Sequence, residues 1–528
     1  MLKYEKYLFH LLVLFALSII LIPKYYITGD GASHTYNAKV LFDYVLGHER
    51  DFYKEFFTIN RGIDPNWMSH LVLGVFVQFM PPWLADKCFQ IIYVLVFAYG
   101  FRYFIRSIEK ENSFLSFLFF PFLFTLPFQQ GFYNYSISLG LLFWSVGFYI
   151  RSRKQIDNSF IQLILSILIL ITSFSHGMPA IYTMLLILLI WVSDHYQSLI
   201  PFDFKKNLIE LSRLFLIFLP SAFMILLFMA KRGTGAVPHA WSKGKKLVEF
   251  LKMWTSQSTR DAERYPAIAV GVLILICLIV LLFTHRKVHI RSKNPMGIVF
   301  IFMAVFTFFS YITCPHSIGG AGSIDIRLAF LPPLFLLFFY ATKAWHATMK
   351  QLFIGVSFVI SVAFLVIRFP FVTKANRIAQ EIMKAGDSIE DKSVVLNISM
   401  DAWQQLPNHD SLFHKDGSFI HIGDYIGAEK NKHLVLAMNY EAEINYFPVN
   451  WQAGKNPRES VEGLIPGNYP PCGDVMAYEK QLNRRLDYVL LQNIRSYPTC
   501  SQAMMNSILT NFTKVYGSKY VELYKRNQ

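Results

Sequence analysis

Residues Ala267 to Phe283 read AIAVGVLILICLIVLLF, a run without a single charged side chain. Such a run approaches the length of about 20 apolar residues that an α-helix needs to cross the hydrocarbon core of a bilayer. Similar uncharged runs are Ile161 to Ile171, Met184 to Val192 and Leu352 to Ile367. The whole chain has this character, because 54% of its 528 residues are hydrophobic and only 16% are charged. We therefore predict a mainly α-helical, polytopic membrane protein.

The first apolar run, Leu8 to Ile22, begins like a signal peptide because Lys3 and Lys6 precede it. It continues into Pro23-Lys24-Tyr25-Tyr26, which lacks the small residues of a cleavage site. We therefore expect this run to remain as the first membrane span.

The net charge of +15 would suggest a nucleic-acid partner in a soluble protein. Here Lys and Arg gather in short loops between apolar runs, which is typical of the cytoplasmic loops of a membrane protein. The clearest such loops are Arg151 to Lys154, His285 to Lys293 and Lys343 to Lys350. We expect no nucleic-acid partner, and we place these loops and the N-terminus in the cytoplasm of a bacterium. The membrane is then the cytoplasmic (inner) membrane.

This orientation assigns several polar segments to the outer side of the membrane. They are the loops 28–67, 231–266 and 315–325, the turn at His176, and everything after Arg368. The loop 231–266 could cover an acceptor site, or its basic half could form an amphipathic helix on the membrane surface.

The region between residues 68 and 150 does not fit this orientation directly. It contains four apolar pieces, 68–81, 83–106, 114–128 and 131–150. If all four crossed the membrane, Arg151 would lie outside. At least one piece must be short or re-entrant, and 68–81, which ends in Pro81-Pro82, is the weakest. We expect about 11–13 transmembrane helices.

After Phe371 charged residues become frequent, and short runs with the composition of β-strands appear. These runs are Ser393 to Ile398, His433 to Met438 and Asp487 to Gln492, with helical patterns between them. We predict a membrane domain over residues 1–370 and an extracytoplasmic α/β domain over residues 371–528. No catalytic or zinc-finger spacing appears there, so His409-Asp410 and Asn439-Tyr440-Glu441 suggest a role in acceptor recognition or support.

The cysteines agree with this division. Cys88, Cys277 and Cys314 lie in or beside apolar runs, where a lone cysteine behaves as a small hydrophobe. Cys472 and Cys500 lie in the polar C-terminal part and could form a disulfide if that part is outside the cytoplasm.

The most unusual segment, TGDGASHTYNAK at Thr28 to Lys39, follows the first span directly. Its glycines permit a tight chain reversal, and His34 comes four residues after Asp30, so both side chains could face one outer cavity. A carboxylate there can act as a general base for an acceptor hydroxyl or amine, and the histidine can orient it or share a metal ion. The alternative is that Asp30 is only an acid favoured at a helix start. A divalent metal ion would need ligands beyond these two residues.

A first span followed by an acid in a long outer loop, and then by a helix with His34 and Asn37-Ala38, resembles the GT-C superfamily of integral membrane glycosyltransferases. More narrowly, the chain is similar to bacterial enzymes of the lipopolysaccharide-core and protein-mannosyl types. The resemblance extends to Asp64-Pro65-Asn66-Trp67, Gly131-Phe132-Tyr133-Asn134-Tyr135, Ser175-His176-Gly177, and Pro315 to Gly320 with Asp325 and Arg327. It implies that Asp30 is the catalytic base. The family often has two adjacent acids in the first loop, whereas Gly31 follows Asp30 here, which leaves Asp64 as the candidate for the second acid.

Enzymes of this kind take a sugar from polyprenyl phosphate, whose phosphate lies at the level of the lipid headgroups. A cation at the outer end of a span would hold it. Arg327, at the start of the apolar run 328–339, is the first candidate because a guanidinium group can bind two phosphate oxygens. Lys231 and Arg232 are the second. The alternative for all three is that they only anchor helix ends at the membrane surface.

Further residues are candidates for the wall of the substrate cavity. His176 interrupts an apolar hairpin, where a polar side chain is costly at membrane depth; alternatively it lies in a surface turn with Gly177 and Pro179. The other candidates are Asn66, Tyr133, Asn134, His316 and Asp325.

Three functions remain open. An inverting glycosyltransferase would move a sugar from a polyprenyl-phosphate donor to a glycolipid or protein acceptor on the outer face. A lipid or solute transporter would need ionisable residues near the midplane and broken, repeated helices. A non-catalytic envelope-assembly protein could use the same scaffold. The apolar runs are largely free of acids and the polar candidates gather on one face, which favours the glycosyltransferase.

Overall fold

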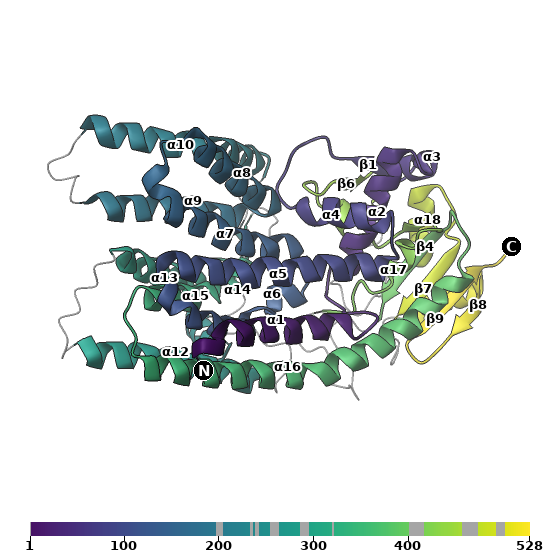
Figure 1. Cartoon of the computed structure of the whole chain (residues 1–528). Coiled ribbons are helices and arrows are strands. Elements are labelled where there is room, and N and C mark those ends of the chain that lie inside the picture. The colour runs from purple at the N-terminus through teal and green to yellow at the C-terminus, as the bar shows by residue number, and fades with distance from the viewer. Residues whose placement is uncertain are drawn as a thin grey trace. The chain divides into compact units, whose positions relative to one another are not determined.

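The computed structural model is shown in Figure 1. It describes residues 2–196, 204–232, 236–237, 242–253, 263–285, 295–318, 322–400, 417–456, 474–492 and 502–528. The chain forms two compact units. Unit 1 consists of Met1–Leu17, Ile92–Phe128 and Asn134–Arg368, and unit 2 of Ser18–Ile91, Gln129–Tyr133 and Phe369–Gln528. The expected boundary at residue 370 stays a prediction, but residues 18–91 belong to the same compact unit as the C-terminal part.

Helices make up the bulk of unit 1. Their bounds, with those of helices that continue into unit 2, are η1 Leu2–Tyr4, α1 Glu5–Leu21, α5 Pro82–Ile108, η2 Lys110–Phe122, α6 Leu126–Gln129, α7 Tyr133–Ser152, η3 Arg153–Gln155, α8 Ser159–Ser175, α9 Gly177–His195, α10 Phe204–Ala230, α11 Lys243–Met253, α12 Arg264–His285, α13 Met296–Thr313, α14 Ile324–Leu328, α15 Leu331–Ala341 and α16 Ala347–Met383. A two-stranded ribbon joins β2 (Ala236–Val237) to β3 (Ser317–Ile318).

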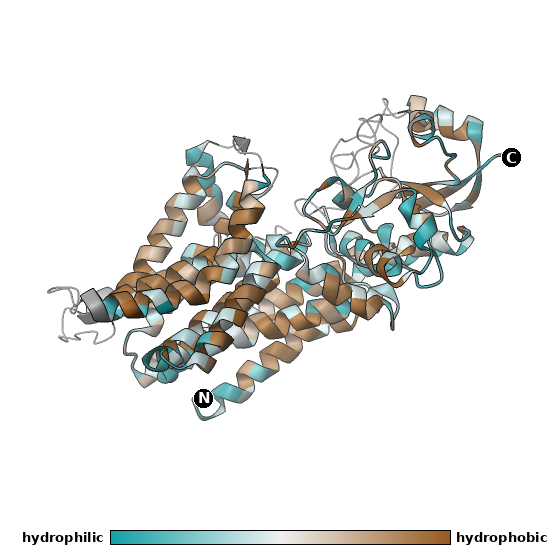
Figure 2. Ribbon diagram, turned by 90° about the horizontal axis from the view of Figure 1, so that it is seen from above, coloured by the Kyte–Doolittle hydropathy of each residue, from teal (hydrophilic) through white to brown (hydrophobic). Residues whose placement is uncertain are grey.

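Seven helical segments among the described residues are long and apolar enough to cross a membrane. They are Pro82–Ile108, Gly177–His195, Asn207–Ala230, Arg264–Leu281, Met296–Thr313, Ile324–Ala341 and Ala347–Ser388, and two shorter apolar helices are Met68–Val77 and Ser159–Ser175. Figure 2 shows the hydrophobic colour along these helices. Their outward faces are apolar as well: Phe215 and Leu226 on α10 are 63% and 65% exposed. Such faces suit lipid rather than water, so the protein is a multi-pass membrane protein.

The lengths of the helices between residues 68 and 133 explain why four membrane spans do not fit between residues 68 and 150. Helix α4 (Met68–Val77) has 10 residues and reaches only ~15 Å, about half of the hydrocarbon core. The piece expected at 114–128 forms the 13-residue 3-10 helix η2 and the short α6. A 3-10 helix rises about 2 Å per residue, so η2 is ~26 Å long and can itself cross. Without α4 as a span, the remaining pieces are compatible with the expected cytoplasmic position of Arg151, and this orientation stays a prediction.

Unit 2 contains the sheet that the C-terminal sequence predicts. Five strands lie in the order β5-β4-β7-β9-β8, with bounds β4 Val394–Ser399, β5 Val435–Leu436, β7 Tyr488–Gln492, β8 Phe512–Gly517 and β9 Val521–Arg526. Strand β4 pairs in parallel with β5 and β7, and β9 pairs antiparallel with β7 and β8. All five residues of β7 are buried, which explains its continuous apolar sequence.

The loop after the first helix is part of this unit. It supplies α2 (Gly31–Leu46), α3 (Arg50–Lys54) and β1 (Phe57–Ile59). Strand β1 pairs antiparallel with β6 (Val449–Trp451) from the C-terminal part, with Phe57 opposite Trp451. The remaining elements of unit 2 are α4, η6 Lys384–Ser388, α17 Asp424–Gly427, η7 Glu441–Glu443, α18 Val475–Leu482 and α19 Gln502–Asn511. Segments almost 400 residues apart in sequence therefore build one local structure.

A buried ion pair joins the first helix to α5 inside unit 1. The guanidinium group of Arg102 donates from Nη1 and Nη2 to the two carboxylate oxygens of Glu5, at 2.6 and 2.8 Å. The side chains of Arg102 and Glu5 are only 8% and 11% exposed. Removing one partner would leave the other charge buried without compensation.

We predict that Glu5→Gln lowers the thermal unfolding midpoint of the purified protein by several degrees, because breaking a buried pair costs roughly 3–5 kcal/mol. The matched control is Glu390→Gln, which removes an exposed partner of Lys525; exposed pairs contribute little. Equal midpoints for the two variants would contradict the structural role of the buried pair.

Candidate functional site

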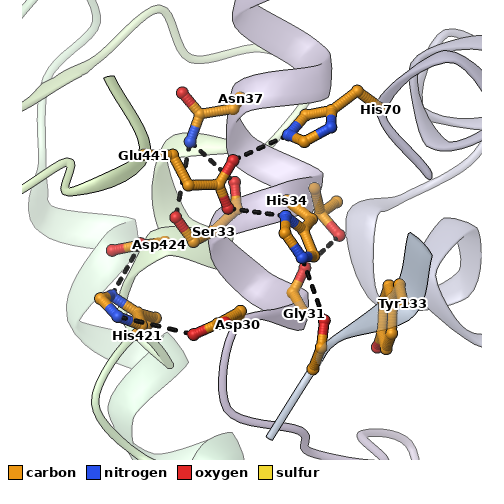
Figure 3. A network of polar contacts seen from close by, with 12 residues as sticks. Asp30, Gly31, Ser33, His34, Asn37, His70, Tyr133, His421, Asp424 and Glu441 are labelled. Atoms are coloured by element: carbon orange, nitrogen blue, oxygen red, sulfur yellow. Dashed lines mark hydrogen bonds and ion pairs between the residues drawn. The ribbon is translucent and has the colours of Figure 1, made fainter. Parts of the chain in front are cut away.

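Asp30 stands at the head of α2, but its side chain does not cap that helix. The backbone fixes its position instead: the N–H of Asp30 donates to the carbonyl of Gln130 at 3.0 Å, and the N–H of His34 donates to the carbonyl of Asp30 at 2.9 Å. The carboxylate is therefore free of a capping bond, and it points toward His421 (Figure 3). The alternative, an acid favoured by the dipole at a helix start, requires no capping bond and stays open.

Two glycines allow the chain to come together here. Gly131 has φ +86°, and a Cβ atom on it would overlap the backbone nitrogen of Asp30. A Cβ atom on Gly31 would lie 2.5 Å from the hydroxyl oxygen of Tyr133. Only a residue without a Cβ atom fits at either position. Glycine at 31 and 131 therefore allows the segment around Asp30 to pack directly against the segment around Tyr133.

A chain of acid, histidine and acid begins at Asp30. Nε2 of His421 lies 4.0 Å from Oδ1 of Asp30, and Nδ1 of the same ring lies 3.5 Å from Oδ2 of Asp424. The amide of Asn397 donates to the other oxygen of Asp424 at 2.7 Å. The ring of His421 stacks on Tyr440, with 4.5 Å between centroids. Asp424 thus orients a histidine whose other nitrogen faces Asp30.

Asp30 is the member of this chain that solvent reaches. Its side chain is 22% exposed, whereas those of His421 and Asp424 are 7% and 1% exposed. Removal from water raises the pKa of Asp30 above its ordinary value, although His421, His34 and a hydrogen bond from Tyr440 act in the opposite direction. A raised pKa makes this carboxylate a better proton acceptor near neutral pH.

A second buried network lies beside the first. The carboxylate of Glu441 contacts two histidine rings. Nδ1 of His34 is 2.7 Å from Oε1, and Nε2 of His70 is 2.7 Å from Oε2. The other ring nitrogen of His34 lies 3.0 Å from the carbonyl oxygen of Gly131. The three side chains are 5% exposed or less. Figure 3 shows Glu441 between the two rings.

Charges within this network compensate each other. Burial would raise the pKa of Glu441, but His34 and His70 hold it far below its usual range. Burial would lower the pKa of His34, but the charge and hydrogen bond of Glu441, together with Asp30, raise it to about 9. The two histidines and the carboxylate therefore offset each other's loss of hydration.

Two further polar contacts lie in unit 2, and the first of them attaches α2 to the C-terminal part. The side-chain amides of Asn37 and Asn439 donate to each other's oxygens at 2.9 and 2.8 Å. The hydroxyl of Tyr133 donates to Asp86 at 2.7 Å and accepts from Gln90 at 2.8 Å. The expected cavity residue Tyr133 is thus the centre of a fully buried network.

Asp64 and Asn66 also lie in unit 2. Asp64 is buried and accepts a hydrogen bond from Asn60 at 3.2 Å. Asn66 has φ +73° and precedes Trp67, whose indole N–H donates to the carbonyl of Tyr446 at 2.7 Å. These residues hold the end of the first loop against the C-terminal part, and the role of Asp64 as a second acid stays a prediction.

The expected phosphate ligands lie in unit 1, and two of them lie near His176. Arg327 and Arg232 are its charged neighbours. Tyr135 connects the cluster: its hydroxyl donates to the carbonyl of Arg327 at 2.5 Å, and its ring meets that of His176 at 5.3 Å between centroids. Lys231 precedes Arg232 at the end of α10.

Three more candidates belong to unit 1 as well. Nδ1 of His316 lies 3.0 Å from the buried carboxylate of Asp325, and Asn134 is buried at the start of α7. Cys472, Cys500 and His409-Asp410 lie outside the described residues.

Sequence reasoning missed several members of the networks around Asp30. His421, Asp424 and Asp86 were not candidates, and Glu441 was assigned only a supporting role. One signal was present: Glu441 closes a polar run directly after a β-like segment, where a strand ends and functional side chains gather. Asp86 lies in an apolar helix, where an acid is costly without partners.

We predict that Gly131→Ala lowers the thermal unfolding midpoint by more than Gly454→Ala does. Both glycines have positive φ, +86° and +73°, so the backbone cost of roughly 1–2 kcal/mol is shared. Only at Gly131 does the new methyl group meet another backbone segment, whereas nothing lies within 4 Å at Gly454. Equal losses in a thermal melt would show that the contact with Asp30 is not tight.

Comparison with known proteins shows the fold. No protein-family model and no curated protein matches the chain. Among solved structures, ArnT from Cupriavidus metallidurans, crystallised with undecaprenyl phosphate bound, is similar at a TM-score of 0.55 and 9% sequence identity. The match covers 98% of this chain and 97% of that chain. The chain therefore has an ArnT-like fold, and the expected helical membrane part with a C-terminal strand-containing region is confirmed.

Proposed function

We propose that the protein transfers a sugar from a polyprenyl-phosphate donor to a glycolipid or protein acceptor on the outer face of the bacterial inner membrane. The observation that carries this proposal is the Asp30 carboxylate, which reaches solvent at the head of α2 and is backed by His421 and Asp424. The fold supports it, because ArnT has the same architecture and binds undecaprenyl phosphate. The proposed orientation has the N-terminus in the cytoplasm and residues 371–528 outside.

The chemistry requires one proton acceptor and one stabilised leaving group. The acceptor's hydroxyl or amine loses its proton to Asp30 as its oxygen or nitrogen forms a bond to the anomeric carbon of the donor sugar. The bond from that carbon to the phosphate oxygen breaks, and polyprenyl phosphate leaves with the electron pair. A single displacement of this kind inverts the configuration at the anomeric carbon. His421 would hold the Asp30 carboxylate in place and favour its ionised form.

The leaving phosphate needs cations, and unit 1 supplies them around His176. The guanidinium group of Arg327 also lies over the ring of Tyr135, 5.7 Å from its centroid, which restricts its motion. Arg232 is similarly placed over Phe228 at 4.6 Å. Preorganised cations lose less entropy on binding phosphate oxygens than free side chains do. The proposal therefore assigns the donor phosphate to Arg327.

A lipid flippase is the second candidate, because unit 1 contains a fully buried ion pair. Nε of Arg368 lies 3.3 Å from Oε1 of Glu263, and both side chains are 0% exposed. Ionisable residues inside helical membrane proteins often mark transport pathways. Movement of a lipid-linked sugar across proteoliposomes without any sugar transfer would favour this candidate.

We predict that Asp30→Asn lowers the rate of sugar transfer roughly 10²–10⁴-fold, since a positioned general base contributes about that much. Activity would be measured with labelled lipid-linked sugars and the full chain in lipid nanodiscs. Asp51→Asn, which removes a fully exposed acid from the same loop, is the matched control and should transfer at the parental rate. Unchanged transfer by Asp30→Asn would remove Asp30 from the mechanism.

We predict that Arg327→Ala raises the KM for the donor roughly 10–100-fold, because a hydrogen bond to a charged group contributes about 1.5–3 kcal/mol. Arg151→Ala is the control, because the Arg151 guanidinium group also lies over a tyrosine ring, that of Tyr103, 4.4 Å from its centroid. Arg151 lies in the last turn of α7, the end of the helix that we expect in the cytoplasm. A donor KM that changes equally in both variants would assign Arg327 to anchoring alone.

A further inference from the structure

We propose that His34, His70 and Glu441 form a binding site for one zinc ion. One ligand atom from each residue can be chosen so that all lie within 4.8 Å of one another. The residues come from α2, α4 and η7, three separate segments of unit 2. This inference rests on these side chains alone and does not depend on sugar transfer.

The donor set selects the class of metal. Two imidazole nitrogens and one carboxylate suit zinc and related transition metals, whereas magnesium and calcium prefer oxygen ligands only. Burial also favours a site of this kind. His70 and Glu441 are 0% exposed, and buried acids and imidazoles are retained where they are paired or bind a metal.

The hydrogen bond from His34 to Gly131 orients the ring for such a role. Because a carbonyl oxygen only accepts, Nε2 of His34 must carry a proton. In the neutral ring, Nδ1 then presents its lone pair to the carboxylate of Glu441, only 2.7 Å away. This arrangement is repulsive unless a proton or a metal ion lies between the two atoms. A backbone carbonyl behind a histidine is also the usual outer support of a zinc ligand.

The spacing is close to what zinc needs. Ligand atoms of a tetrahedral zinc ion with bonds of about 2.0–2.1 Å are separated by roughly 3.3 Å. The histidine nitrogens are each 2.7 Å from a different oxygen of Glu441, and one ligand atom from each residue lies within 4.8 Å of the others. Zinc binding therefore needs the two rings to move away from the carboxylate, while the three segments keep their places. Three protein ligands leave a fourth position for one water molecule.

A zinc ion would act as a crosslink at the head of α2. It would connect α2, α4 and η7 through bonds stronger than the hydrogen bonds they replace, one helical turn from Asp30. The competing description is a purely protonic network, in which His34 stays an imidazolium ion. The two descriptions differ in metal content and in the response of stability to chelators.

The experiment uses the full chain, purified in detergent without a metal-affinity column. Metal content would be measured by inductively coupled plasma mass spectrometry. Zinc affinity would then be measured by competition with a chromophoric chelator after the protein has been stripped. We expect one zinc ion per chain. We also expect a dissociation constant below roughly 1 µM, the range in which such a chelator competes for zinc. Stripping should lower the thermal midpoint by several degrees, and added zinc should restore it.

Variants test the ligands. His70→Gln and Glu441→Gln should each lose the zinc ion, whereas His433→Gln, which removes a histidine 3.1 Å from Asp391 elsewhere in unit 2, should keep it. Circular dichroism and size-exclusion chromatography would identify a variant that fails to fold. The stripped parental protein tests the proposal independently of the variants. If it binds no zinc at micromolar concentration and its thermal midpoint does not respond to zinc, protons alone hold the network together and the proposal is wrong. Binding by a folded Glu441→Gln variant with parental affinity would also overturn it.

Discussion

The buried carboxylate of Glu441 is the constraint on which the arrangement around α2 depends. A charge with no exposed surface is tolerated only when opposite charge or hydrogen bonds compensate it. His34 and His70 provide this compensation at 2.7 Å each. Because His34 belongs to α2 and Glu441 lies 407 positions later in the chain, the helix after the first span cannot form its native contacts without the C-terminal part. Unit 2 is therefore assembled from both ends of the sequence.

Asp30 gains its chemical character from this assembly. The carbonyl of Gly131 supports His34, and the backbone of Asp30 rests against Gly131 itself. These contacts leave the Asp30 side chain free of its own helix and directed at His421. The result is a partly exposed carboxylate surrounded by buried, mutually compensated groups. In the proposed function, such a site separates Asp30, as the reacting acid, from the acids that only maintain the structure.

The sequence predicted the features that depend on local composition. Uncharged runs such as Ala267 to Phe283 correspond to helices long enough to span, and the β-like runs near residues 394, 435 and 488 form neighbouring strands. The Asp30 segment was found because glycine, acid and histidine are unusual together at a membrane boundary. Its contact with His421 was not predictable, since no spacing rule connects residues so far apart.

The short elements were also difficult to predict for physical reasons. The aromatic run at 114–128 has the hydropathy of a spanning α-helix, yet Pro121 and tertiary packing place most of it in the 3-10 helix η2. In the sequence, Asp86 is the only acid in the apolar helix α5. Its partners, the hydroxyls of Tyr133 and Tyr425, come from two other segments, so its compensation is visible only in three dimensions.

The central claims are that Asp30 receives the acceptor's proton and that Arg327 holds the donor phosphate. A cryo-electron microscopy structure of the Asp30→Asn variant in nanodiscs, with an intact polyprenyl-phosphate sugar, tests these claims most directly. The account predicts phosphate oxygens within hydrogen-bond distance of Arg327 and the anomeric carbon open to attack from the side of residue 30. A donor bound with its phosphate away from Arg327, or with its anomeric carbon turned away from residue 30, would contradict it.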